Sequence, residues 1–264
     1  MRVRFRGVRG SVPLAAPEAA GVGCNTACIE AADERTGATL ILDAGSGLAG
    51  VDPPARHIPL VLSHYHWDHV LGLPYFAPLF QADRTVTLYT PRLAAYDAGW
   101  FDMLFRAPFF PISCEQLPTV PPQRMVEPGR VAIDGFEVTA VALNHPGGAF
   151  AYRIGGTDGD FVYVTDHEFG DPAYDEPLAA FVAGAAAAVF DAHFTPDERP
   201  RFAGWGHSDW RQCAEFAAAN GIGSLYLFHH KPGRTDAELS DIGTAARRVF
   251  AATEIAREGQ TLSV

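Results

Sequence analysis

Cysteine, lysine and long apolar stretches are scarce in this chain of 264 residues. The longest apolar run, Leu178–Phe190, is shorter than the roughly 20 residues that span a bilayer. The amino terminus alternates arginine with valine and phenylalanine and has no signal-peptide core. The four cysteines are too few for a disulfide framework, and their spacing does not predict a structural zinc site: Cys24, Cys28, Cys114 and Cys213. We therefore expect a soluble, cytoplasmic protein without a membrane partner.

Basic side chains are also outnumbered. Lysine and arginine together number 20 against 31 aspartates and glutamates, which gives a formal charge of −11. Lys231 is the single lysine. Because a negative overall field repels phosphate backbones, we do not expect general nucleic-acid binding.

The remaining composition, 48% apolar and 19% charged, is typical of a globular protein. Period-2 or short apolar runs predict strands at residues 2–6, 38–43, 58–63, 84–89, 131–143, 149–154, 160–165, 187–191 and 224–228. Longer periodic segments predict helices at residues 93–105, 177–184, 208–220 and 236–250. Strands that dominate both halves, with helices between or after them, favour a layered αβ/βα sandwich in one domain covering residues 1–264.

The segment 93–128 differs from the rest of the chain because aromatic residues and prolines are concentrated there. Its aromatic residues include Trp100, Phe101, Phe105, Phe109 and Phe110. The pattern indicates an aromatic flap over a substrate site. A buried helix pair or a contact in a homo-oligomer would leave the same pattern, and the sequence does not decide between these interpretations.

A concentrated group of ligand side chains follows the predicted strand 58–63. The chain continues His64-Tyr65-His66-Trp67-Asp68-His69. Burying imidazoles and carboxylates without partners is costly, and strand ends place clustered side chains in a shared cleft. Alternation puts His64 and His66 on one side, where they can hold one metal ion, and the next turn lets Asp68 and His69 reach a second. The alternative is a fortuitous histidine-rich turn.

This His-x-His-x-Asp-His block after an apolar strand resembles the signature of the metallo-β-lactamase superfamily. Further elements match in order along the chain: Asp43 in Leu40–Gly47, His145 in Asn144-His145-Pro146, Asp166 after Tyr163-Val164-Thr165, and His229 after Leu227-Phe228. The resemblance implies an α/β fold of the αββα type, with two mixed β-sheets flanked by helices. It also implies two metal ions, the first held by His64, His66 and His145, the second by Asp68, His69 and His229, with Asp166 bridging them and Asp43 supporting the ligands. Such donors suit zinc, with manganese and iron as alternatives.

A second block indicates the branch of the superfamily. Gly206-His207-Ser208 resembles the His-Ser-Thr block of the ribonuclease Z and phosphodiesterase branch, with Asp209 in place of the usual threonine. The resemblance implies that His207 faces the substrate phosphate and either stabilises the developing charge or protonates the leaving oxygen. A helix N-terminus beside His207 would also offer free backbone N–H groups to an anion. The alternative is a buried histidine that only caps the helix.

The resemblance is closer to the phosphoribosyl cyclic-phosphate phosphodiesterases than to ribonuclease Z, whose lysine-bearing arm for tRNA is not seen here. The leading hypothesis is therefore a dinuclear hydrolase of a small phosphodiester, including cyclic and nucleotide diesters. In it a metal-bridging hydroxide attacks phosphorus, and Asp68 and His207 are catalytic. A lactone, thioester or β-lactam hydrolase of the same fold and a non-catalytic metal-binding domain are the alternatives.

For the four remaining histidines, only their positions in the sequence predict a location or a role. His57 precedes a strand and is expected on the surface, and His167 is expected to point away from its neighbour Asp166. His230 follows a ligand and is expected to be exposed, with a hydrogen bond that supports the ligands as the alternative. For His193 a role near the metal ligands and a purely structural role are equally compatible with the sequence.

Overall fold

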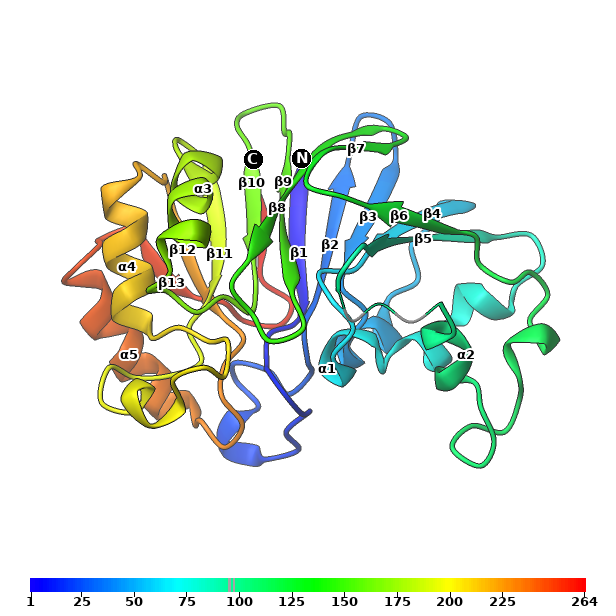
Figure 1. The fold of residues 1–264 in the computed structure, drawn as a ribbon, viewed down its shortest axis with the longest axis horizontal. Helices are drawn as coiled ribbons and strands as arrows, with labels where there is room; N and C mark the ends of the chain where they lie inside the picture. Colours follow the sequence, from blue (N-terminus) through cyan, green and yellow to red (C-terminus); the bar gives the residue numbers. More distant parts are fainter. Residues whose placement is uncertain (95, 97) are drawn as a thin grey trace.

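The structure is a computed structural model that describes residues 1–94, 96 and 98–264. Within these residues, two seven-stranded sheets pack face to face, and helices cover the outer faces (Figure 1). The first sheet has the order β14-β1-β2-β3-β4-β5-β6 and the second the order β13-β12-β11-β10-β9-β8-β7. This is the αββα sandwich that the resemblance predicts.

The strands of the first sheet are β1 (Arg2–Gly7), β2 (Cys28–Asp33), β3 (Ala38–Leu42), β4 (His57–Val61), β5 (Thr85–Pro91), β6 (Gln123–Val126) and β14 (Thr261–Ser263). Those of the second are β7 (Gly129–Ile133), β8 (Phe136–Leu143), β9 (Ala149–Ile154), β10 (Phe161–Val164), β11 (Ala187–Asp191), β12 (Leu225–Phe228) and β13 (Thr253–Ile255). The α-helices are α1 (Trp67–Val70), α2 (Trp100–Leu104), α3 (Pro172–Val182), α4 (Trp210–Ala219) and α5 (Asp236–Arg247).

Each sheet combines parallel and antiparallel pairs. Strands β3 to β6 are parallel to one another, as are β10 to β13, while the remaining neighbours are antiparallel. Strands β10, β11 and β12 are buried along their whole length, as parallel strands with both faces covered usually are. The carboxyl ends of parallel strands meet at one edge of a sheet, and this edge is where ligands bind in open α/β folds.

Two clusters of buried apolar residues stabilise the sandwich. The larger lies between the sheets and extends under α3, α4 and α5. The smaller packs α1 and α2 against the outer face of the first sheet and includes Trp100, Phe101 and Phe105 of the segment 93–128. These aromatic side chains are therefore core residues, whereas Phe109 is 86% exposed. A flap function for the segment stays a prediction.

Most predicted elements are present, with different ends. The predicted helix 93–105 is reduced to α2, and positions 95 and 97 of that prediction lie outside the described residues. Helix α3 begins earlier than predicted because Asp171 caps it and Pro172 occupies its first turn. The predicted strand 131–143 is a hairpin that turns at Asp134-Gly135. Strands β2, β6, β13 and β14 were not predicted, since they are short or carry charged residues. No helix among the described residues is long and apolar enough to cross a membrane.

Candidate metal centre

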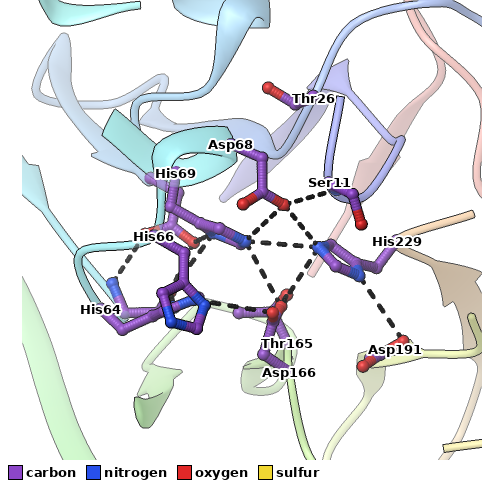
Figure 2. Close-up of polar contacts among 12 residues, drawn as sticks. Ser11, Thr26, His64, His66, Asp68, His69, Thr165, Asp166, Asp191 and His229 are labelled. Atoms are coloured by element: carbon purple, nitrogen blue, oxygen red, sulfur yellow. Dashed lines mark hydrogen bonds and ion pairs between the residues drawn. The ribbon is translucent and has the colours of Figure 1, made fainter. Parts of the chain in front are cut away.

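The predicted ligands lie at the carboxyl ends of strands from both sheets. His64 follows β4 and Asp43 follows β3 in the first sheet, whereas His145, Asp166 and His229 follow β8, β10 and β12 in the second. His66, Asp68 and His69 come from the loop after β4 and from α1. The structure thus brings together all seven side chains that the sequence singled out as ligands. Figure 2 labels His64, His66, Asp68, His69, Asp166 and His229 of this set.

The first group consists of His64, His66, His145 and Asp166. Nε2 of His145 lies 3.0 Å from Nδ1 of His66. Oδ2 of Asp166 lies 3.6 Å from Nε2 of His64 and 3.6 Å from Nε2 of His145. The buried Nε2 of His64 has no hydrogen-bond partner among the described residues. A cation at the centre would satisfy this nitrogen, so the donor set fits a metal ion.

The second group consists of Asp68, His69 and His229. Oδ2 of Asp68 lies 3.2 Å from Nε2 of His69 and 3.1 Å from Nε2 of His229, and the two nitrogens are 3.3 Å apart. Oδ1 of Asp166 lies within 3.4 Å of both nitrogens. Asp166 therefore turns one carboxylate oxygen toward each group, as Figure 2 shows.

Asp43 holds ligands of this centre in place through hydrogen bonds. Its buried carboxylate accepts hydrogen bonds from Nδ1 of His69 at 2.7 Å, from the hydroxyl of Tyr163 at 2.7 Å, and from both the backbone N–H and the hydroxyl of Ser63. In the neutral form of His69 the proton sits on Nδ1, where Asp43 accepts it, and Nε2 is left with a lone pair toward the site. The Ser63 hydroxyl also lies 2.9 Å from Nδ1 of His64. Ser63 was missed, since a serine at a strand end carries no distinctive sequence signal.

The pKa values of the histidines are shifted in opposite directions in the two groups. Burial lowers the pKa values of His64, His66 and His145, which favours the neutral form that binds metals. For His69 and His229 burial acts in the same direction, but the neighbouring carboxylates outweigh it and raise both pKa values, that of His229 to about 10. Without a cation these two imidazoles therefore carry protons.

The pKa values of the carboxylates Asp68 and Asp166 are lowered. Burial alone would raise the pKa values of Asp68 and Asp166, but the imidazoles of His69 and His229 outweigh it and hold both well below their usual range. Both carboxylates thus remain ionised in the buried centre. A metal ion would replace the imidazole protons as the positive charge that balances them.

His207 lies next to the two groups and is held by a partner that the sequence did not identify. Its Nδ1 donates to Oδ2 of Asp191 at 2.7 Å, at the end of β11. The ring stacks against those of His193 and His229, with centroids 4.5 Å and 5.2 Å away. Burial alone would lower the pKa of His207, but the carboxylate of Asp191 outweighs it and raises that pKa. The raised pKa favours the protonated form of His207, whose side chain lines the pocket described next.

A pocket of about 260 Å³ opens above the ligands, lined by Ser11, His66, Trp67, Asp68, Asp166, His207 and His229. The backbone N–H of Ser11 donates to Oδ2 of Asp68 at 2.7 Å. Ser11 has no distinctive signal in the sequence, because its contribution comes from the backbone of a loop far from the histidine-rich turn. The α4 N-terminus does not offer the free N–H groups that were expected. The side chain of Asp209 already accepts from the N–H groups of Arg211 and Gln212.

The other histidines have structural partners. His193 is buried, and its Nδ1 lies 3.0 Å from the carbonyl oxygen of His229. The expectation that His230 is exposed is wrong, because it is buried and its Nε2 donates to the carbonyl oxygen of Ala256. His167 turns away from the centre, as predicted, toward Asp175 at 3.1 Å, and His57 is on the surface.

The fold and the two His/Asp groups define a hydrolase of the metallo-β-lactamase fold. The sequence matches the family model of the beta-lactamase superfamily domain over residues 40–230, and the chain belongs to this family. It is 26% identical to a ribonuclease Z from Bradyrhizobium sp. (strain ORS 278), over 85% of this chain and 86% of that protein. The predicted similarity to the ribonuclease Z branch is thus confirmed.

Two solved structures share the fold. The metallo-beta-lactamase fold protein YhfI from Bacillus subtilis superposes with a TM-score of 0.74 and 21% identity, covering 99% of this chain and 98% of that chain. A diphosphatase from the PhnP family superposes with a TM-score of 0.72 and 17% identity, covering 99% of this chain and 97% of that chain. At these identities the likeness describes the fold alone.

Proposed function

We propose that this protein is a dinuclear, zinc-dependent phosphodiesterase that hydrolyses a small phosphodiester, with His207 as the general acid. The observation that carries the proposal is the Asp191–His207 pair beside two facing ligand groups. A protonated imidazole next to the centre suits a reaction whose leaving group is an alkoxide that needs a proton.

The donor set supports two ions. Three histidines and one Asp166 oxygen can hold the first, and Asp68, His69, His229 and the other Asp166 oxygen can hold the second. Imidazole and carboxylate donors in four-coordinate arrangements are typical of zinc. Divalent ions bound there would lower the pKa of water and polarise the phosphoryl group, which supplies the nucleophile at neutral pH.

In this mechanism, side chains of the protein donate and accept the protons. Water attacks phosphorus, the bond from phosphorus to the leaving oxygen breaks, and Nε2 of His207 gives its proton to that oxygen. Asp191 keeps Nδ1 of His207 engaged, so that the ring can donate only through Nε2. Asp68 lines the same pocket. In this proposal its carboxylate accepts a proton from the attacking water. The names of two similar proteins, a ribonuclease and a diphosphatase, support phosphate chemistry.

Hydrolysis of a lactone or thioester is the second candidate. The seven residues that line the pocket include neither lysine nor arginine, so apart from bound metal ions only His207 and the ligand histidines offer positive charge. A neutral substrate would tolerate such a lining. His207 distinguishes a phosphodiester from a thioester, because a thiolate leaving group has little need of a general acid. A lactone also releases an alkoxide, so the substrate panel below separates it from a phosphodiester.

Replacement of His207 by alanine tests the proposal. We expect metal content to stay at the wild-type level and phosphodiester hydrolysis to fall roughly 100-fold. The loss should be larger for an alkyl ester, whose leaving oxygen needs the proton, than for a p-nitrophenyl ester, whose leaving group does not. His57→Ala is the matched control, because it removes an exposed histidine remote from the site.

The substrate panel consists of bis-p-nitrophenyl phosphate, a cyclic nucleotide, a homoserine lactone and nitrocefin. Preference for the last two would overturn the phosphodiesterase assignment in favour of acyl hydrolysis. Equal loss with good and poor leaving groups in His207→Ala would contradict the acid role, even if the diesters are substrates.

A further inference from the structure

A second, apolar cavity adjoins the pocket above the ligands. It has a volume of about 160 Å³ and is lined by Tyr65, Trp67, Val70, Trp100, Met103 and Leu104. Trp67 lies between the ligands His66 and Asp68 in the sequence and lines both this cavity and the pocket. A molecule bound above the ligands can therefore extend over Trp67 into the apolar cavity without leaving the protein surface.

The walls of the apolar cavity present mainly carbon atoms. The hydroxyl of Tyr65 donates to the carbonyl oxygen of Pro91 at 2.8 Å, and Nε1 of Trp100 donates to Oε1 of Gln123 at 2.9 Å. The rings of Tyr65 and Trp100 pack against each other with centroids 5.1 Å apart and form one wall of the cavity. A nucleobase needs hydrogen-bond partners for its ring atoms, whereas a hydrocarbon ring needs only contact area.

The size and exposure of the cavity agree with a single ring. An apolar cavity of about 150 Å³ accommodates a benzene molecule. The exposed fractions of Trp67 and Met103 are 66% and 45%, so two large apolar side chains at this cavity remain in water until something covers them. Exposed apolar residues next to a pocket are typical of a ligand-binding surface.

The cavity and the general acid belong to different halves of the molecule. The cavity is formed by α1, α2 and the loop before α1, whereas His207 precedes α4, and Figure 1 shows α1 and α2 on one half and α4 on the other. The leaving oxygen must be near His207. The ester arm that reaches the cavity is therefore the arm that stays on phosphorus.

We propose that the apolar cavity beside Trp67 binds an aromatic hydrocarbon ring on the non-leaving arm of the substrate, so that the protein prefers aryl phosphodiesters. This inference rests on the proposed phosphodiesterase function. It assigns Trp67, Tyr65, Trp100 and Met103 to substrate specificity, apart from the ligands and from His207.

The test compares two diesters with the same leaving group, p-nitrophenyl phenyl phosphate and p-nitrophenyl methyl phosphate. We expect the wild-type protein to show a kcat/KM about tenfold or more higher for the phenyl diester, because only phenyl fills the cavity. Met103→Glu places a charge in the cavity and should reduce this ratio to near one, whereas Met103→Leu should keep it. Phe109→Glu is the matched control, since Phe109 is exposed and does not line the cavity.

A binding measurement separates recognition from turnover. Phenylphosphonate should bind the metal-loaded protein about tenfold more tightly than methylphosphonate in calorimetric titrations, and Met103→Glu should abolish the difference. If neither diester is hydrolysed, the phosphodiesterase function fails and this inference with it. If both are hydrolysed with a ratio near one, or if Met103→Glu keeps the wild-type ratio, only the aryl preference is overturned.

Discussion

Backbone strain in this protein is concentrated at the residues that build the metal centre. Four non-glycine residues of the described chain have positive φ angles, namely Ser11, Asp43, Asp166 and His229. Asp43 and His229 directly follow strands, Asp166 comes two residues after the end of β10, and Ser11 donates its N–H to Asp68. Such conformations cost of order 1–3 kcal/mol each and persist only where surrounding contacts enforce them. At these positions the strained turn aims a carboxylate, an imidazole or an N–H into the centre.

The carboxylate of Asp191 is expected to control the protonation of His207. Asp191→Asn keeps the shape of the side chain but removes the negative charge that raises the pKa of His207. Less His207 is then protonated at neutral pH, and we expect hydrolysis of alkyl diesters to fall about 10- to 100-fold with metal content retained. The measurement is kcat for a poor and a good leaving group.

Asp209→Asn is the matched control for this substitution. Asparagine caps helices as well as aspartate does, so α4 should be preserved and activity should stay close to wild type. Unchanged kinetics in Asp191→Asn would remove Asp191 from the acid mechanism.

At the scale of elements, the loop after β1 closes one side of the centre. The N–H of Gly10 donates to the carbonyl oxygen of His230 at 3.1 Å, and Arg9 forms short β-bridges to Thr26 and His230. This pairing presses the backbone of Gly10 against the ring of His229. A Cβ atom at position 10 would lie 2.4 Å from Cε1 of His229, closer than real contacts allow.

Gly10→Ala should therefore displace His229 and weaken the second ion site. We expect bound metal, measured by elemental analysis after gel filtration, to fall from two equivalents toward one, with the fold retained in circular dichroism. Gly50→Ala is the matched control, since a Cβ there meets nothing within 4 Å. Two tightly retained equivalents in Gly10→Ala would show that the loop does not position His229.

For the whole molecule, the metal centre joins the two sheets. His64 and His69 belong to the first sheet and its loops, whereas His145 and His229 follow strands of the second. An ion that binds only the folded chain stabilises it by mass action, by about 2.7 kcal/mol when its concentration is 100 times Kd. The bound ions should therefore contribute to the stability of the sandwich as well as to its chemistry.

Removal of metal by a chelator should lower the melting temperature by about 5 °C or more, and added zinc should restore it. Asp166→Asn should shrink this response, because it weakens the carboxylate that faces both groups. Asp171→Asn, at the exposed cap of α3, should keep the wild-type response. A wild-type melting temperature that is the same with and without chelator would contradict the stabilising role.

Local patterns predicted much of this architecture. The strands with strong apolar runs, such as β4, β10 and β12, are present close to their predicted positions, and the short strands β13 and β14 were missed. Short edge strands exist because a neighbour pairs with them, so their own residues carry little signal. The exposure predicted for His230 was wrong for a related reason, since its partner, the carbonyl of Ala256, is supplied by a distant segment.

The sequence by itself determined which side chains could serve as metal ligands and in what order. Burying the imidazoles and the carboxylate of the run His64 to His69 is costly unless they share a partner such as a metal ion. The sequence also determined that strands should precede those ligands, since the period-2 pattern is local. Only the tertiary structure decided which groups support the ligands. Tyr163 reaches Asp43 and Asp191 reaches His207 across long stretches of chain, and Ser11 acts through a backbone N–H that any residue possesses. The apolar cavity beside Trp67 likewise arises only where α1 and α2 pack together, because a cavity is a property of surfaces that meet in space.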